Sequence, residues 1–223
     1  MTSLQENVDS STPKWRPLEA VDRRVLGVLV EKAKTTPANY PLSLNAIKSG
    51  ANQKSNRFPQ MQLDDDQIEE SLDRLREFGA VSFIQGDGRV QKYRHLAYEW
   101  LGVEKVELAI MAELLLRGAQ TVGELRGRAA RMEPIKGLRE LDPLVESLSA
   151  KMLVVYLTPP GRGAIVTHHL YEPRELEKVK RENAATSPSV SVTPSPTSVP
   201  AAELSVQPAD DAVARLRQEI EQL

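Results

Sequence analysis

The chain has 223 residues, of which 40% are hydrophobic and only 4% aromatic, so its core must consist mainly of aliphatic side chains. It contains no cysteine, which excludes disulfides, thiolate metal sites and thiol catalysis and is typical of a reducing compartment. The formal net charge of −2 excludes a uniformly basic nucleic-acid coat. No apolar run reaches about 18 residues and the N-terminal segment has no apolar core, so we expect a cytoplasmic protein without a membrane span or secretory signal.

Apolar periodicity and turn residues predict three helices and a hairpin in the first half of the chain. The expected helices cover 19–34, 43–49 and 65–78, and the expected strands cover 80–84 and 89–95. Asp64 is the expected N-cap of the third helix, and Gly79 is its expected end. Three helices followed by a two-stranded hairpin are typical of a winged helix.

The same order recurs in the second half. The expected helices cover 103–117, 121–132 and 137–151, and the expected strands cover 152–157 and 164–171. Thr121 and Glu124 fit a capping box. The residue at which the last helix starts is not fixed by the sequence, because Pro143 lies inside the expected range and proline is favoured only in the first turn of a helix. The tripeptide Glu-Ser-Leu occurs at 70–72 and 146–148, on the third helix of each copy. The sequence therefore predicts an α+β fold, mainly helical, with two tandem winged-helix domains of the helix-turn-helix class.

Composition predicts where these domains begin and end. The expected parts are a disordered N-terminus (1–15), two winged-helix domains (16–98 and 99–172), a Pro/Ser/Ala/Val-rich linker (173–208) and a short amphipathic helix (209–223). The linker and the short helix after it form an expected disordered C-terminal tail, because such a composition buries too little apolar surface to fold. The junction at Tyr98, Trp100 and Leu101 is short and apolar, so we expect the two domains to pack together.

The sequence offers no catalytic or metal-binding constellation. His168 and His169 are adjacent on an expected strand and therefore point to opposite faces, and His95 is far from both in the sequence. The run 64–66 is acidic, but it lacks the alternating ligand spacing of a calcium loop and is better explained by helix capping. We expect a non-enzymatic protein with no catalytic residue, metal, cofactor or small-molecule substrate.

Charge is distributed unevenly over the first domain. Its third helix begins with Asp64, Asp65, Asp66, Glu69 and Glu70, which would repel phosphates, so we expect this helix not to read DNA in the usual pose. Basic and amide side chains elsewhere are candidates for nucleic-acid binding: Lys48, Asn52, Gln53, Lys54, Asn56, Arg57, Arg89, Lys92, Arg94, Arg117, Arg126, Arg128 and Arg131. Each cluster can equally be solvated surface or paired within the chain, and the 126–131 arginines can border the interface between the two copies.

Two long strings carry a family resemblance. They are VLGVLVEKAKTTPANYPLSLNAIKSGANQKSNR at 25–57 and LLLRGAQTVGELRGRAARM at 114–132. Both resemble the YceH-like family of bacterial proteins, and the similarity extends over about 18–172. The resemblance implies tandem winged helices and implies no particular biochemical role.

The sequence supports two hypotheses of function. The first, slightly favoured by fold analogy, is a DNA-associated, transcription-regulator-like protein that binds duplex DNA, with Lys54 and Arg57 essential for binding. The alternative is an adaptor that binds a protein partner or a second copy of the chain. Its candidate interaction residues are Asp65, Asp66, Glu69 and Glu70 on the third helix and Val213, Leu216, Ile220 and Leu223 in the C-terminal stripe.

Overall fold

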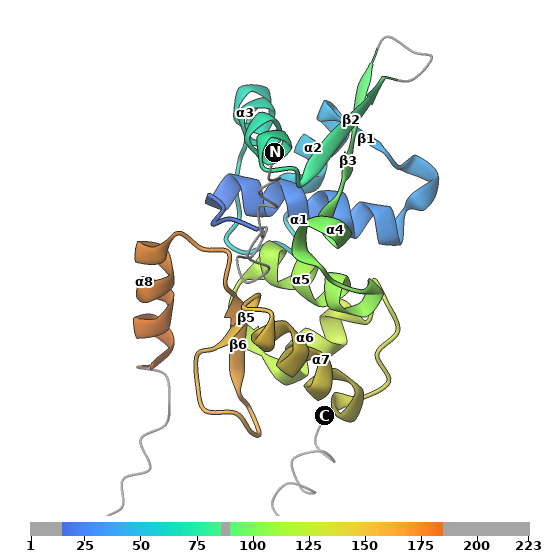
Figure 1. Ribbon diagram of the computed structural model, residues 1–223. Helices are drawn as coiled ribbons and strands as arrows, with labels where there is room; N and C mark the ends of the chain where they lie inside the picture. The colour runs from blue at the N-terminus through green and yellow to red at the C-terminus, as the bar shows by residue number, and fades with distance from the viewer. Residues whose placement is uncertain (1–14, 86–89, 185–223) are drawn as a thin grey trace, which may run out of the picture. The chain divides into compact units, whose positions relative to one another are not determined.

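The computed structural model describes residues 15–85 and 90–184 (Figure 1). Its first half contains α1 (Ala20–Thr35), the 3-10 turn η1 (Pro37–Asn39), β1 (Leu42–Ser43), α2 (Leu44–Ala51), α3 (Asp65–Glu77), β2 (Val81–Gln85) and β3 (Gln91–His95). Its second half contains α4 (Ala97–Leu101), α5 (Lys105–Arg117), β4 (Gln120–Thr121), α6 (Val122–Ala129), α7 (Leu138–Ala150), β5 (Val154–Tyr156), β6 (Ile165–His168) and α8 (Pro173–Ala184). The expected α+β class, mainly helical, is confirmed for these residues. The tail stripe and Arg89 lie outside them.

Each half carries a small antiparallel sheet of three strands. The strand order is β1-β3-β2 in the first sheet and β4-β6-β5 in the second, so the last strand lies in the middle of each. Phe83 is the cross-strand partner of Tyr93 in the first hairpin, and Val154 is that of His168 in the second. Both halves therefore repeat one order of elements: helix, short strand, two helices and a hairpin. The two-residue strands β1 and β4 were not predicted, because so short a segment carries no alternation to detect.

The expected helix caps are present. Asp64 accepts a hydrogen bond from the Gln67 backbone N–H and forms a capping box at the start of α3. Thr121 and Glu124 form the corresponding box at α6. Gly79 follows α3 with a φ of 74°, a conformation that glycine adopts without strain. The helix α7 begins at Leu138 although Pro143 lies inside it, so the proline does not delay the helix start.

The two halves pack together through α1 and α5, the helices with which the repeated order of elements begins. Both helices are buried on nearly every side, Asp22–Glu31 in α1 and Glu107–Leu116 in α5. The contact is close at Gly27, where an added Cβ would lie 2.9 Å from the Leu116 side chain. The expected packing of the halves is therefore found in the described residues, and Trp100 and Leu101 of α4 are buried at the junction.

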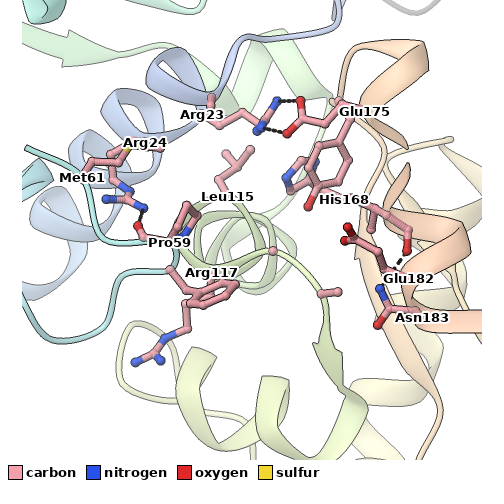
Figure 2. Close-up of a pocket in the computed structure, with 16 residues that line it drawn as sticks. Arg23, Arg24, Pro59, Met61, Leu115, Arg117, His168, Glu175, Glu182 and Asn183 are labelled. Atoms are coloured by element: carbon pink, nitrogen blue, oxygen red, sulfur yellow. Dashed lines mark hydrogen bonds and ion pairs between the residues drawn. The ribbon is translucent and has the colours of Figure 1, made fainter. Parts of the chain in front are cut away.

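The helix α8 corrects the expected linker, which was placed at 173–208. Its segment PRELEKVKRENA is rich in helix-forming residues, and Leu176 is buried against the rest of the chain. Glu175 forms a two-bond ion pair with Arg23 of α1, with Nη–Oε distances of 2.5 and 2.9 Å (Figure 2). Folded structure therefore extends to residue 184. None of the helices in the described ranges is long and apolar enough to cross a membrane.

Candidate functional site

The outward face of α3 is acidic along its whole length. Ile68, Leu72 and Leu75 are buried and fix the orientation of the helix, so its period of 3.6 residues turns the intervening carboxylates to solvent. The exposed acidic residues are Asp65, Asp66, Glu69, Glu70, Asp73 and Glu77. The four carboxylates that the sequence proposed for protein interaction are thus all accessible.

Two aromatic rings of the first hairpin lie beside this acidic face. Phe83 and Tyr93 are opposite each other on β2 and β3, and Phe83 is 41% exposed. The pKa of the Tyr93 phenol is raised by burial and then by the charges of Glu69 and Asp73, so these carboxylates face the ring. The groove between helix and hairpin, here called the α3–β2 groove, is lined by Asp73, Arg76, Glu77, Val81, Ser82 and Phe83.

An arginine of the chain already occupies part of this groove. The Arg76 guanidinium lies over the Phe83 ring, 4.6 Å from its centroid, and pairs with Asp73 at 2.8 Å. Glu69 and Glu77 form no ion pair with any residue in the described ranges. Carboxylates around an exposed ring have the chemistry to bind a lysine or arginine side chain, through charge and through the face of the ring.

Sequence reasoning missed Asp73, Arg76, Glu77 and Phe83 as site residues. The available signal was strand alternation, which puts Phe83 on the same face of β2 as the buried Val81 and therefore toward α3. Alternation alone does not tell how far the neighbouring helix extends, so the exposure of the ring could not be read from it.

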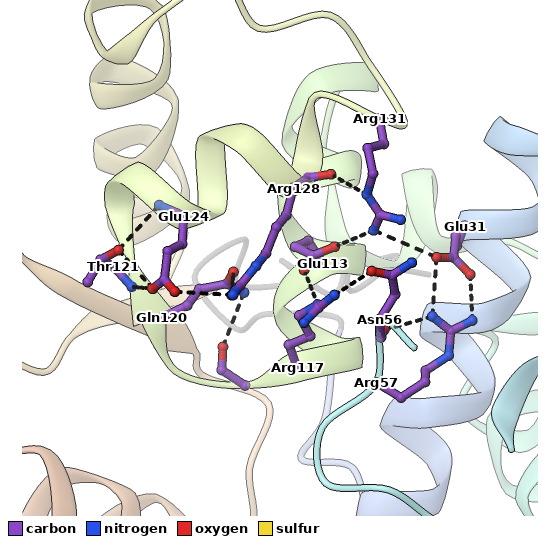
Figure 3. A network of polar contacts seen from close by, with 11 residues as sticks. Glu31, Asn56, Arg57, Glu113, Arg117, Gln120, Thr121, Glu124, Arg128 and Arg131 are labelled. Carbon is purple, nitrogen blue, oxygen red and sulfur yellow. Dashed lines mark hydrogen bonds and ion pairs between the residues drawn. The ribbon is translucent and has the colours of Figure 1, made fainter. Parts of the chain in front are cut away.

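Arg57, a candidate phosphate ligand, is a structural residue. Only 4% of it is exposed, and its guanidinium forms a two-bond ion pair with Glu31 of α1, at 2.5 and 3.2 Å (Figure 3). Its Nε–H donates to the Gly50 carbonyl at 2.9 Å. The guanidinium is thus paired within the chain, which was one of the alternatives that the sequence left open, and DNA binding by Arg57 stays a prediction.

Glu113 forms ion pairs with two more of the candidate arginines. It is fully buried on α5 and pairs with Arg117 at 2.8 Å and with Arg131 at 3.1 Å (Figure 3). Burial raises the pKa of Glu113, and the two guanidinium groups oppose that rise. Arg131 also lies 4.0 Å from Glu31 of the first half. Arg131 therefore borders the interface between the halves, which was one of the alternatives that the sequence left open for the 126–131 arginines, and Arg117 contacts Asn56 of the first half as well.

The remaining arginines of this group also have partners within the chain. Arg128 pairs with Glu124 at 3.1 Å and donates to the Gln120 side chain at 2.9 Å. Arg126 is half-buried, and its guanidinium lies 3.4 Å from the Ile135 carbonyl. Both side chains are partly exposed, so nucleic-acid binding by Arg126 and Arg128 stays a prediction.

The candidate amides serve the fold of the 52–63 segment. Asn52 donates to the Leu63 carbonyl and accepts from the Leu63 N–H, both at 2.8 Å. Gln53 accepts from Arg57 at 2.9 Å. Asn56 has a φ of 58° and accepts from Arg117. These bonds engage both amide atoms of Asn52 and the carbonyl oxygens of Gln53 and Asn56, and base reading by these residues stays a prediction.

Four candidate cations remain near the surface. Lys48 pairs with Asp65 at 2.8 Å. Lys54, Lys92 and Arg94 are exposed and form no ion pair with the described residues. Lys92 and Arg94 alternate with Tyr93 on β3, so they project from the face of the sheet opposite to α3.

The histidines have local roles. Burial, together with the charge of Lys34, lowers the pKa of His95 to about 4. His168 is buried and stacks on Tyr171 with centroids 3.9 Å apart, whereas the His169 ring lies 5.9 Å from that of Trp15. Among residues 15–85 and 90–184, no three His, Cys, Asp or Glu side chains are grouped to hold a metal ion.

A family model and several relatives that match this chain all point to one protein family. A family model described as "Protein of unknown function, DUF480" matches residues 18–162. A UPF0502 protein of Rhodopirellula baltica is 55% identical over 183 residues, covering 80% of this chain and 76% of the relative. A UPF0502 protein of Geotalea daltonii is 49% identical and covers 65% of this chain and 68% of its own length. A UPF0502 protein of Koribacter versatilis is 45% identical and covers 66% of this chain and 71% of its own length. The match to the family model and the identity to these bacterial relatives together show that the chain belongs to the DUF480, or UPF0502, family.

Proposed function

We propose that the protein is a non-enzymatic protein-interaction adaptor, built from winged-helix domains over 16–98 and 99–172, whose α3–β2 groove binds a basic segment of a partner protein. The repeated order of helix, short strand, two helices and hairpin supports the winged-helix assignment. The central position of the last strand in both sheets supports it as well.

One observation carries the binding proposal: the exposed Phe83 ring lies beside the acidic stripe of α3, in which Glu69 and Glu77 have no ion-pair partner among the described residues. A single exposed ion pair contributes only about 0–1 kcal/mol. Separate cations of a basic segment can contact the ring face and these carboxylates, each contact adding to the affinity, and apolar residues of the segment can cover Phe83.

Charge disfavours the usual DNA-binding pose for both third helices. The helix α3 carries six acidic and two basic residues between Asp65 and Glu77. The helix α7 carries Glu140, Asp142 and Glu146 and a single arginine. Either helix in a major groove would bring carboxylates against phosphates and would release no counterions.

The test is site-specific photocrosslinking in cells of the source organism. A benzophenone amino acid replaces Phe83 in one variant and Leu138, a 49% exposed residue of α7, in the control. We expect a discrete protein adduct from position 83 alone, and we expect its loss when Glu69→Lys and Glu77→Lys are added. The partner peptide found in that adduct must then bind the purified protein. Equal adducts from both positions, or adducts that survive the charge reversal, would overturn the proposal.

A second candidate function rests on Lys92 and Arg94, which project together from the sheet and are unpaired among the described residues. These side chains could contact a DNA backbone. Duplex binding measured by fluorescence anisotropy at about 50 and 200 mM salt should then be steeply salt-dependent. It should be abolished by Lys92→Glu with Arg94→Glu and unchanged by Lys136→Glu with Arg139→Glu, two exposed positions in the second half. Absence of binding at low salt excludes this function.

A further inference from the structure

A pocket of about 340 Å³ opens where the two halves meet α8 (Figure 2). Its walls come from α1, the segment at Phe58 and Pro59, the end of α5, β6 and α8. Phe58, Leu115 and Val179 supply apolar surface, and Arg24 and His168 supply polar groups. A concave site of this size, with apolar and polar walls of similar extent, suits a small molecule that has both an apolar body and a charged group.

Arg24 differs from the other arginines that line the pocket, because it is buried and has no ion-pair partner among the described residues. It is 1% exposed, and its charge has no carboxylate partner in the described part of the chain. Two of its N–H groups donate to the carbonyls of Ala51 and Pro59, at 3.0 and 2.6 Å, and its buried Nε has no partner. Burial, and then the charge of Arg57, lowers the pKa of Arg24 to about 10. A buried charge that has carbonyl acceptors but no carboxylate partner is costly to the fold, so its presence in a pocket wall points to a counterion that arrives with a ligand.

The other arginines of the pocket already have carboxylate partners. Arg23 is neutralised by the two-bond pair with Glu175, and Arg117 by Glu113. Figure 2 shows Arg24 and Arg117 on one side of the pocket and Glu182, on α8, on the other. An anionic group would therefore be favoured at the Arg24 side and disfavoured at the α8 side.

His168 offers a second donor. The Leu170 backbone N–H donates to its Nδ1 at 3.2 Å. Burial lowers the pKa of this ring well below its usual value, so the ring is neutral and its proton is on Nε2. The Nε2–H forms no hydrogen bond with the described residues. The Tyr171 ring, stacked on the imidazole, supplies a flat wall beside it.

We propose that this pocket binds a small organic anion, a carboxylate or a phosphate monoester with an apolar body, with the anionic group held by Arg24 and the body lying along Phe58, Leu115 and Val179. This site is independent of the α3–β2 groove, because it shares no residue with it. Either proposal can therefore fail without the other.

Titrations of the full-length protein, followed by backbone amide NMR shifts, test the proposal with four probes. Benzoate and phenyl phosphate combine an anion with a ring, benzyl alcohol has the ring alone, and inorganic phosphate has the anion alone. We expect benzoate or phenyl phosphate to bind at least tenfold more tightly than benzyl alcohol and inorganic phosphate, with shifts around Leu115, Leu170 and Val179. Comparing benzoate with phenyl phosphate identifies the anion that the pocket prefers.

Variants show whether binding occurs at the pocket. Val179→Trp fills it from α8, whereas Arg181→Trp adds the same ring to the exposed face of that helix and is the matched control. Binding should be lost in the first variant and kept in the second, and Arg24→Gln should remove the preference for the anion. The proposal is overturned if no probe binds, if the neutral probe binds equally well, or if Val179→Trp binds like the control. Because Val179→Trp leaves Arg24 in place, the test holds even if Arg24→Gln fails to fold.

Discussion

Arg57 and Glu31 form a buried two-bond ion pair that joins the segment after α2 to the C-terminal half of α1. The pair is closed on all sides: the arginine also donates to the Gly50 carbonyl, and only 5% of Glu31 is exposed. Its removal is therefore a question of stability, not of ligand binding.

Breaking this pair from one side should be strongly destabilising. In Arg57→Ala the Glu31 carboxylate stays buried without its partner, and we expect the free energy of unfolding in urea to fall by about 3–5 kcal/mol. The matched control is Lys54→Ala, three residues away and exposed, which should change it by less than about 0.5 kcal/mol. Similar losses in both variants would contradict a structural role for the pair.

The contact between α1 and α5 should be sensitive to a single methyl group. Gly27→Ala puts a Cβ 2.9 Å from the Leu116 side chain, so we expect a loss of about 1–3 kcal/mol in unfolding free energy. Gly127→Ala in α6 meets no atom within 4 Å, and its better helix propensity should stabilise the protein by up to about 1 kcal/mol. Opposite signs for the two glycines in thermal or urea unfolding would establish the close approach. A stabilising Gly27→Ala would refute it.

Stability should fall on mild acidification because of two histidines, the half-buried His95 and the buried His168. The pKa values of His95 and His168 are lowered in the folded state, so below about pH 6.5 the unfolded chain binds protons that the folded chain does not. Each histidine should then remove up to about 1.4 kcal/mol per pH unit, down to about pH 4 for His95.

Carboxylates also titrate in this range, and Glu113, with its raised pKa, acts in the opposite sense. The measurement is therefore a difference: urea unfolding of the natural protein and of His95→Gln between pH 7 and 4.5. The variant should show the shallower dependence on pH. Parallel curves would mean that His95 is not buried in its neutral form.

Arg76 should act as a competitor within the α3–β2 groove. It occupies Asp73 and the Phe83 ring, two of the groups that the cations of a partner would use. In Arg76→Gln we expect the partner peptide identified by crosslinking to bind several-fold more tightly in fluorescence anisotropy. Arg94→Gln, on the opposite face of the sheet, should bind with unchanged affinity. Weaker binding in Arg76→Gln would mean that Arg76 itself contacts the partner.

Local rules predicted much of the fold. Asp64 and Thr121 marked the starts of α3 and α6, because an N-cap is recognised from a few neighbouring residues. The helix α8 was missed although Leu176 and Val179 are spaced by three residues, since the proline-rich segment after residue 184 dominated the composition of the region.

The site was harder to predict, because burial depends on partners far away in the sequence. Arg57 lies in a segment that is basic and polar, and nothing within ten residues of it identifies Glu31 as its partner. Arg117 and Arg131 depend in the same way on Glu113, which the sequence places inside an apolar helix. Exposure of Phe83 and burial of Arg24 are likewise set by the packing of separate elements.

The pairing of α1 with α5 joins two equivalent helices, one from each repeat of the same element order. Contacts between equivalent surfaces are what a twofold homodimer makes. The chain thus resembles a dimer whose subunits were joined end to end, with its subunit interface kept as the core. We expect neither repeat to fold alone, since separation would expose a helix that is buried on nearly every side in this arrangement. Co-expressed as two fragments, the halves should be recovered only as a one-to-one complex.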